Sequence, residues 1–352
     1  MDFDRLITDT RIVAIVTRQA LMPETGADGI VCPPTYQDEG SSVPTYNINA
    51  LSDGHNVCTI DSVPSQINRI EARFAEEEPY RSLVPHVIVK AQVKINKLAD
   101  WQEDREIDLL TAPHRLADAS VRFADQLEAR ALDAFKRFHA GDAEGIAQLS
   151  PMSLLFGAWD SHVTGVKIPR TFTARIEARD VETRERRNYY LTRLSANEVE
   201  LNAGDDNKAK TLSNIGLDNA GSKTLDGVHA KGGILREAIS NLIVLRKNVG
   251  MKSLRRDELL RYLLGLQLVS QTLPGYGFLR QGCTLVPSGK PESFVRLADG
   301  SMEAFDLTHE AALDYAHAQA KAFQIDPSPQ VFNFSKEKAQ TELKARNSKN
   351  KK

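Results

Sequence analysis

Long apolar runs are absent from this 352-residue chain. None approaches the ~18–20 apolar residues that a membrane-spanning helix needs. The N-terminal segment, MDFDRLITDTR, is acidic and lacks the basic and apolar regions of a secretory signal. The three cysteines, Cys32, Cys58 and Cys283, are odd in number and widely spaced, which argues against a disulfide framework or a zinc site. We therefore expect a cytoplasmic protein that has no membrane partner.

The short motifs of common enzyme classes are also missing. Neither the phosphate-binding pattern GxxxxGK[ST] nor the dinucleotide pattern GxGxxG occurs, and GxSxG, HExxH and paired CxxC are absent. Asp205 and Asp206 stand in a polar loop without a nearby histidine, so we interpret them as loop residues rather than a metal pair. These absences disfavour a metabolic enzyme, and we expect no cofactor and no bound metal.

Charge is distributed unevenly, although the formal net charge is only −2. Residues 1–80 carry 5 Lys and Arg against 13 Asp and Glu, or −8. Residues 231–262 carry 8 against 3, and the tail 335–352 carries 7 against 2, or +5 each. This separation indicates either ordinary solvated faces or head-to-tail assembly around a polyanion.

The spacing of apolar residues predicts a mixture of strands and helices. Strands are expected over 11–18, 86–95, 171–181, 283–287 and 294–298, with a strand-like run at 154–156. Helices are expected over 65–78, 115–140, 234–248, 254–272 and 308–323, with Ser62 or Ser65, Gly141 and Thr308 as caps. Segments 22–55 and 202–233 are rich in turn residues and read as loops. Without regular alternation of strand and helix, the pattern favours an α+β fold.

Residues 151–170, PMSLLFGAWDSHVTGVKIPR, are the most informative stretch. Trp159, Ser161, His162, Lys167 and Arg170 follow an apolar run that ends at Gly157. Aromatic, polar and basic residues in one short loop suit a polyanion that carries flat bases. Trp159 has two interpretations, a stacking platform and a core aromatic, and we favour the core.

Two further segments predict phosphate seats at helix N-termini. Gln66, Asn68 and Arg69 cluster near the expected start of the 65–78 helix, where free backbone N–H groups attract anions. Lys231-Gly232-Gly233, with Arg236 one turn later, precedes the expected 234–248 helix. The alternative interpretations are an ordinary polar cap for the first segment, which is the more common case, and a tight turn for the second.

His114 and Arg115, in TAPHRLAD, stand where the expected 115–140 helix begins. A lone histidine is more often structural than catalytic, because general-base catalysis needs an orienting partner. Asp53, His55 and Asp61 form a similar loose group of carboxylates near a histidine in the first loop.

Five blocks together resemble a known family. They are Asp53-Gly54, IDSVPSQINRIE (60–71), LTAPHRLADAS (110–120), LLFGAWDSHVTGVKIPR (154–170) and KGGILREAISNLIVLRK (231–247). In this order they are similar to the Cascade backbone subunit of type I-G CRISPR systems (formerly I-U), a member of the RAMP superfamily.

This resemblance implies a modified RRM or ferredoxin-like palm with finger and thumb insertions. We expect one palm domain over 1–330, with insertions near 22–60 and 182–232, and a lysine-rich, disordered tail over 331–352. Copies of such a subunit stack head to tail along CRISPR RNA and present it for pairing with target DNA. The family is non-catalytic, and other Cascade subunits and a recruited helicase-nuclease complete the ribonucleoprotein.

A guide holder contacts phosphate and 2′-OH rather than base edges. The expected RNA-binding residues are Gln66, Asn68, Arg69, His114, Arg115, Trp159, Ser161, His162, Lys167, Arg170, Lys231, Gly232, Gly233 and Arg236. The alternative function is a RAMP-type endoribonuclease that acts on CRISPR or target RNA. In that case His114, His162 or one of Asp53, Asp61, Asp205 and Asp206 would be catalytic.

Overall fold

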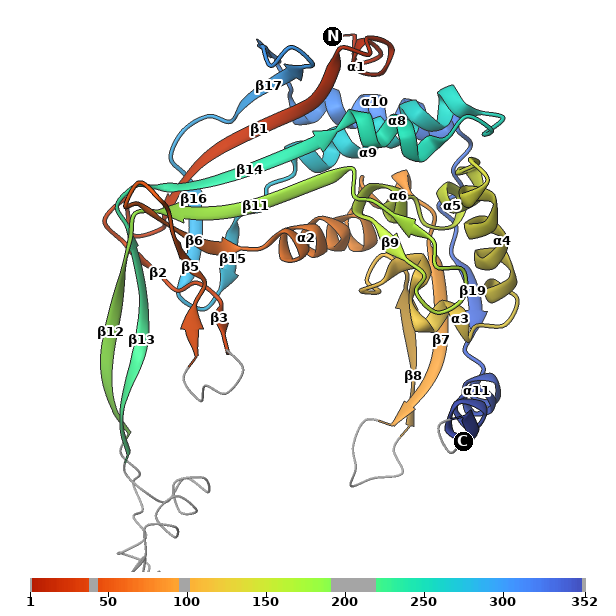
Figure 1. The fold of residues 1–352 in the computed structure, drawn as a ribbon, viewed down its shortest axis with the longest axis horizontal. Helices are drawn as coiled ribbons and strands as arrows, with labels where there is room; N and C mark the ends of the chain where they lie inside the picture. Colours follow the sequence, from red (N-terminus) through yellow and green to blue (C-terminus); the bar gives the residue numbers. More distant parts are fainter. Residues whose placement is uncertain (1, 38–43, 95–101, 191–219, 350–352) are drawn as a thin grey trace, which may run out of the picture.

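The computed structural model describes residues 2–37, 44–94, 102–190 and 220–349, and it is built around a curled antiparallel sheet. Four strands lie side by side in the order β1 (Ile12–Pro23), β14 (Ile234–Asn241), β11 (Phe172–Arg179) and β6 (Asn56–Asp61). β16 (Cys283–Pro287) and β17 (Glu292–Leu297) pair with β1. The sheet spans the top of an arch in Figure 1.

The chain path is that of an RRM-like unit. β1 and β11 are both antiparallel to β14, so they run parallel to each other on its two sides. α2 (Val63–Glu76) lies between them in sequence, and α9 (Arg256–Thr272) lies between β14 and β16. This β-α-β-β-α-β order is the ferredoxin-like connectivity. The predicted α+β class with an RRM-like palm is confirmed.

Both helices cover the same face of the central sheet. Gln271 of α9 donates a hydrogen bond to the Ala238 carbonyl of β14 at 2.8 Å. Gln66 of α2 accepts a hydrogen bond from the Arg236 side chain at 3.0 Å. Arg236 lies two residues before Ala238, so both face the same side of β14. Alternate residues of β14 are buried beneath these helices, which explains its strictly alternating pattern.

Two hairpins project from opposite ends of the sheet toward the same side (Figure 1). One is β12 (Val181–Tyr190) with β13 (Ala220–Ala230), and the other is β7 (Val87–Lys94) with β8 (Gln102–Asp108). β13 occupies part of the segment 202–233 that was expected to be a loop, and β2 (Ile30–Val31) pairs with it. Residues 202–219 of that expected loop, including Asp205 and Asp206, lie outside the described residues. These two hairpins and the palm give the molecule its arched outline.

The remaining described elements are short. They are α1 (Arg5–Thr8), β3 (Thr35–Tyr36), β4 (Thr45–Tyr46), β5 (Ile48–Ala50), η1 (Arg81–Leu83), α5 (Glu144–Leu149), β9 (Ala158–Trp159), β10 (Lys167–Ile168), β15 (Gly277–Arg280) and β18 (Met302–Ala304). The 22–55 segment therefore contains four short strands and turns rather than an unstructured loop. None of the helices among the described residues is long and apolar enough to cross a membrane.

Several predicted elements and caps are confirmed. Ser62 caps α2, its side chain accepting from the Ser65 N–H, and the helix ends at Glu76, before Pro79. Thr308 caps α10 (His309–Ala322) by accepting from Ala311 N–H. α9 and the strands β1, β7, β11, β16 and β17 fall where apolar spacing placed them.

The expected strand at 154–156 is wrong, because these residues belong to the helix α6 (Pro151–Phe156). All six of its side chains are buried, so the segment shows neither the period of two nor that of 3.6 residues. Proline at the first helical position favours a helix start.

The expected helix over 234–248 is wrong in its first half. Residues 234–241 form β14, and only α8 (Leu242–Val249) is helical, capped by the Asn241 side chain. A strand inserted between two others, with helices on one face, is apolar enough to resemble a buried helix.

The expected 115–140 helix is divided into three. These parts are η2 (Arg115–Ala117), α3 (Ala119–Arg122) and α4 (Leu127–His139). Asp118 caps α3, and Gln126 has a positive φ of 63°, which a continuing α-helix does not allow. The apolar spacing is preserved across these breaks, so periodicity alone did not reveal them.

The tail expected to be disordered contains regular structure. β19 (Gln330–Asn333) pairs in parallel with β7, and α11 (Lys336–Lys349) follows it. Because β7 lies between β8 and β19, the C-terminal segment completes a separate three-stranded sheet on the right of Figure 1.

A buried ion pair joins α2 to the turn at residues 113–117. Arg115 donates from Nε and Nη2 to the two carboxylate oxygens of Glu71, at 2.6 and 2.7 Å. Its Nη1 donates to the Gly157 carbonyl at 3.1 Å. Burial raises the pKa of the Glu71 carboxyl, while the hydrogen bonds and charge of Arg115 oppose that rise. One guanidinium therefore holds three segments together.

Arg115→Met should destabilise the protein by about 3–5 kcal/mol, because it leaves the Glu71 carboxylate buried without its partner. Urea denaturation would measure the loss. Arg130→Met, which removes an exposed arginine of α4, is the matched control and should change stability by under about 1 kcal/mol. The double variant Glu71→Leu/Arg115→Met should recover much of the loss. Equal stability of Arg115→Met and Arg130→Met would contradict this account.

Candidate functional site

An open groove of about 920 Å³ lies beside the β9–β10 hairpin. Three segments supply its walls: the 113–117 turn, residues 156–170, and Lys247 of α8. The groove gathers seven of the residues singled out from the sequence, namely His114, Arg115, Trp159, Ser161, His162, Lys167 and Arg170. The residues of the 110–120 and 151–170 blocks that were predicted to bind RNA therefore lie together along this groove.

Gly157 sets the turn between α6 and this hairpin. Its φ of +87° lies in a region that disfavours residues with a Cβ atom. A Cβ there would lie 3.0 Å from Arg170 Cγ and 3.1 Å from the Ile168 carbonyl oxygen. Arg170 itself donates from Nε to the Phe156 carbonyl at 3.1 Å. The glycine thus allows the two ends of the 157–170 loop to close against each other.

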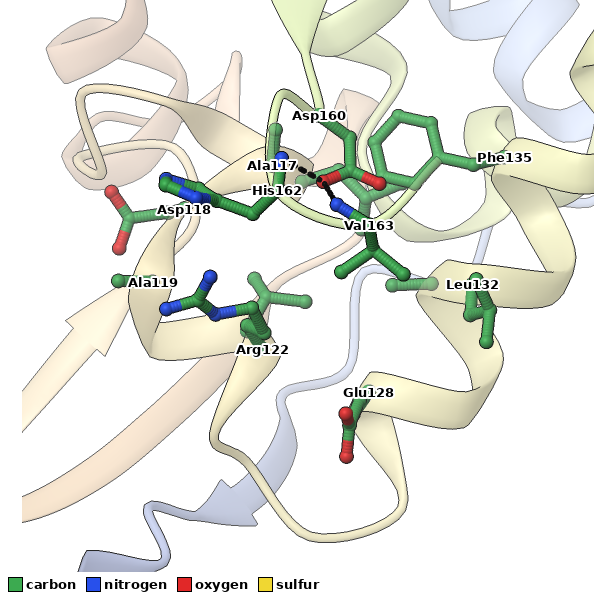
Figure 2. Close-up of a pocket in the computed structure, with 13 residues that line it drawn as sticks. Ala117, Asp118, Ala119, Arg122, Glu128, Leu132, Phe135, Asp160, His162 and Val163 are labelled. Carbon is green, nitrogen blue, oxygen red and sulfur yellow. Dashed lines mark hydrogen bonds between the residues drawn. The ribbon is translucent and has the colours of Figure 1, made fainter. Parts of the chain in front are cut away.

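Asp160 organises the loop between β9 and β10. Its carboxylate accepts from the backbone N–H groups of His162, Val163 and Thr164, at 3.4, 3.2 and 2.8 Å. Figure 2 shows the first two of these bonds converging on Asp160. Burial favours the neutral acid, but these hydrogen bonds and one from the Thr164 hydroxyl outweigh it, so the pKa of Asp160 is lowered. Asp160 is therefore a structural anion that places His162 at the groove edge.

Trp159 is exposed, so the preferred interpretation of this residue as part of the core is wrong. Its side chain is 57% accessible, and it stands directly opposite Lys167 across the β9–β10 pair. Lys167 Nζ lies 4.4 Å from the centre of the indole ring, within cation–π range. The hairpin is only two residues long on each strand, so it has no second layer to cover the ring.

The groove is positively charged. Lys167, Arg170 and Lys247 are exposed on its walls, and His114 and His162 are exposed beside them. Among the described residues that line it, none is Asp or Glu. A concave surface with one sign of charge concentrates its field, so this groove attracts polyanions.

Three of the other predicted residues belong to a buried cluster around Asp61, here called the Asp61 cluster. Asp61 is fully buried and accepts from Ser65 Oγ (2.8 Å), Gln66 Nε2 (2.7 Å), Arg69 Nε (3.1 Å) and Arg280 Nη2 (3.0 Å). Gln66 is also fully buried, so it cannot contact a ligand as predicted. Of the charged side chains in the cluster, those of Arg69 and Arg280 reach solvent, at 32% and 26% accessible.

Arg236 joins this cluster from β14 and is almost completely buried. Its Nε donates to Gln66 Oε1, while its Nη2 has no hydrogen-bond partner among the described residues. Burial lowers the pKa of Arg236 to about 10, which leaves it charged at neutral pH. It was predicted to contact RNA one turn into a helix, but it lies on a strand and under two helices. The Asp61 cluster thus holds three guanidinium groups around one carboxylate.

The helix start on which the predicted phosphate seat at Lys231-Gly232-Gly233 depended is wrong, because residues 234–241 form β14. The three residues form the turn between β13 and β14, with Gly233 at a φ of +83°. Lys231 is ion-paired with Glu182. The groove lies at the other end of β14, since the Asn241 N–H donates to the Thr171 carbonyl beside it. Seven residues of strand separate the two ends by about 23 Å.

Two functional candidates were missed and one predicted residue stands alone. Lys247 lines the groove and Arg280 binds Asp61, but neither was selected from the sequence. The pair Arg246-Lys247 gave a signal, although Arg246 donates to four carbonyls near the N-terminus and only Lys247 faces the groove. Asn68 is exposed on α2. No sequence pattern connected Arg280 to Asp61, because 219 residues separate them.

The carboxylates considered for catalysis are placed differently from the groove histidines. Asp61 is buried and bonded to two guanidinium groups. Asp53 accepts from the backbone N–H of His55, and His55 Nδ1 lies 2.6 Å from Asp180, at the base of the β12–β13 hairpin. The hydrogen bond and charge of Asp180 raise the pKa of His55.

Comparison with known protein families gives a match over the first half of the chain. Residues 15–183 match the family described as CRISPR-associated protein GSU0053 (Cas_GSU0053). No curated protein matches the chain. The matched segment runs from β1 into β12 and contains Asp61, α2 and every groove residue except Lys247. This match marks the chain as a CRISPR-associated protein.

Proposed function

We propose that this protein is a non-catalytic backbone subunit of a type I-G Cascade complex that holds CRISPR RNA in the β9–β10 groove. The observation that carries the proposal is the groove itself. It combines an exposed indole ring with Lys167, Arg170 and Lys247 and has no acidic residue in its described lining. Cations neutralise phosphates, and an aromatic face accepts any base, so such a groove binds single strands without reading their sequence.

The arrangement suits an RNA that must remain available for pairing. A guide strand held by its backbone leaves its base edges free for target DNA. The partly exposed Arg69 and Arg280 of the Asp61 cluster add a second positive region on the palm. The two projecting hairpins are candidates for the thumb and finger that reach neighbouring copies (Figure 1).

The proposed partners follow from the same role. Copies that contact each other through two different surfaces form an open helical filament when the rotation does not close a ring. We propose that this chain forms such a filament on CRISPR RNA, presents the RNA to target DNA, and contacts other Cascade subunits and a separate helicase-nuclease.

Removing positive charge from the groove should weaken RNA binding and make it less dependent on salt concentration. Lys167→Gln/Lys247→Gln removes two cations, so the slope of log affinity against log salt should fall in magnitude by about 1.4, at ~0.7 per phosphate contact. Fluorescence anisotropy with labelled single-stranded RNA measures the slope.

The control for this experiment is Lys290→Gln/Lys321→Gln, which removes two exposed lysines outside the groove. Its slope should equal that of wild type, and the groove variant should weaken unrelated RNA sequences equally. Loss confined to one sequence would instead indicate base reading.

Trp159→Ala should reduce RNA affinity by about 1–3 kcal/mol, the contribution of one stacked base, whereas Trp159→Phe should retain most of it. Phe278→Ala is the matched control, because Phe278 is an exposed aromatic (68% accessible) outside the groove. The same anisotropy titration measures all three variants. Unchanged affinity of Trp159→Ala would show that the indole does not bind a base.

The alternative function, a RAMP-type endoribonuclease, draws on His114 and His162 at the groove walls. Labelled CRISPR-repeat and target RNAs, incubated with and without Mg²⁺, should remain intact with the wild-type protein. The control is a His114→Ala/His162→Ala variant purified by the same procedure. Cleavage that persists with this variant would come from a contaminating nuclease. Wild-type cleavage that either histidine change abolishes would replace the non-catalytic proposal.

A further inference from the structure

A second hollow, here called the α4–α8 cleft, adjoins the groove. It has a volume of about 360 Å³ and shares Lys167, Pro169 and Lys247 with the groove lining. The end of α4, the end of the β9–β10 loop and the end of α8 supply its other walls. Because the two hollows meet at these shared residues, a strand that lies along Lys167 and Lys247 can pass from one into the other.

The α4–α8 cleft is built on two turns that are fixed against each other. Gly250 has a φ of +75°, and a Cβ atom there would lie 2.2 Å from the Gly141 carbonyl oxygen, so the close approach requires glycine. The Lys252 N–H donates to the same carbonyl at 3.0 Å. Asn248 Nδ2 donates to the Pro169 carbonyl at 3.0 Å and joins α8 to the end of β10. The walls of the cleft therefore keep fixed positions relative to each other.

The cleft has a basic lining. Lys167, Lys247 and His139 are exposed in it, and none of its described lining residues is Asp or Glu. Lys252 is exposed beside the cleft, and its Cγ lies 3.8 Å from the position that a Cβ on Gly141 would take. The Lys252 side chain therefore passes over one wall of the cleft and adds a cation to those shared with the groove.

The negative charge near the cleft is smaller than the positive charge. Asp142, the carboxylate next to Gly141, is ion-paired with Arg137 at 2.5 Å. The C-terminal ends of α4 and α8 contribute roughly −0.5 each, or about −1 together. Three lysines, at 167, 247 and 252, supply +3, and the ion pairs of lysine in the described part of the chain involve other lysines. The balance favours an anion.

We infer that single-stranded RNA continues from the groove into the α4–α8 cleft, where Lys252 binds the phosphate that follows those held in the groove. The inference rests on the proposed function. A continuous chain of phosphates is the occupant that fits, because the cleft and the groove share Lys167 and Lys247 and form one positively charged path.

Lys252→Gln in the full chain tests the inference. The substitution removes one charge and keeps the backbone hydrogen bond from residue 252 to Gly141, so the turn is retained. For a long single-stranded RNA the magnitude of the salt slope should fall by about 0.7, with a roughly 5-fold loss of affinity near 0.1 M salt. In a series of labelled oligouridines of increasing length, this loss should begin only above the length that fills the groove.

The matched control is Lys290→Gln, which removes an exposed lysine outside both hollows and should match wild type at every length. Fluorescence anisotropy measures all three proteins. Wild-type protein that binds RNA, with Lys252→Gln unchanged at every length, would overturn the cleft path and leave the groove proposal standing. A loss that is the same at all lengths, or the same as that of Lys290→Gln, would also overturn the cleft path. Wild-type protein that fails to bind RNA would overturn the proposed function itself.

Discussion

The buried ion pair between Glu71 and Arg115 is the interaction on which the groove depends. It joins α2, which covers the sheet, to the 113–117 turn and, through the Gly157 carbonyl, to the start of the β9–β10 hairpin. A guanidinium that makes three hydrogen bonds in a dry environment has one geometry available, and removing either charge leaves the other uncompensated. The palm and the groove wall are therefore held in one fixed relation by a single side chain.

Arginine and lysine have different roles in this protein. Arg115, Arg236 and Arg246 are directed into the structure, where their several donors satisfy carboxylates and backbone carbonyls. Lys167 and Lys247 remain exposed on the groove walls. This division follows from the chemistry of the two side chains, because the rigid guanidinium fork suits buried polar networks and the strongly hydrated ammonium does not. A lysine at position 115 would therefore conserve the charge but could not reproduce the two-pronged pairing with Glu71.

The sequence was a good guide to elements with a clear period and a cap. α2, α9 and α10 were predicted because their apolar residues recur at helical spacing and because Ser62 and Thr308 mark two of their starts. It misled where residue type does not follow burial. The side chains of the 154–156 run are all buried, so the run has no amphipathic period. The 234–241 strand alternates in burial, but its buried positions include Arg236 and Ser240 and its half-buried positions include Leu235 and Ile239, so the sequence does not show the alternation. The breaks in 115–140 depend on local backbone conformations that apolar spacing does not record.

By itself, the sequence determined the α+β class, the residue types of the groove and the motif blocks, because composition and local spacing carry that information. Only the tertiary structure decided which charged residues are available. It buried Gln66, Arg115 and Arg236, exposed Trp159, separated Lys231 from the groove, and brought Lys247 into it. The physical reason is that a charged side chain binds a ligand only if no internal partner satisfies it first. Those partners, such as Glu71 for Arg115 and Glu182 for Lys231, come from distant parts of the chain.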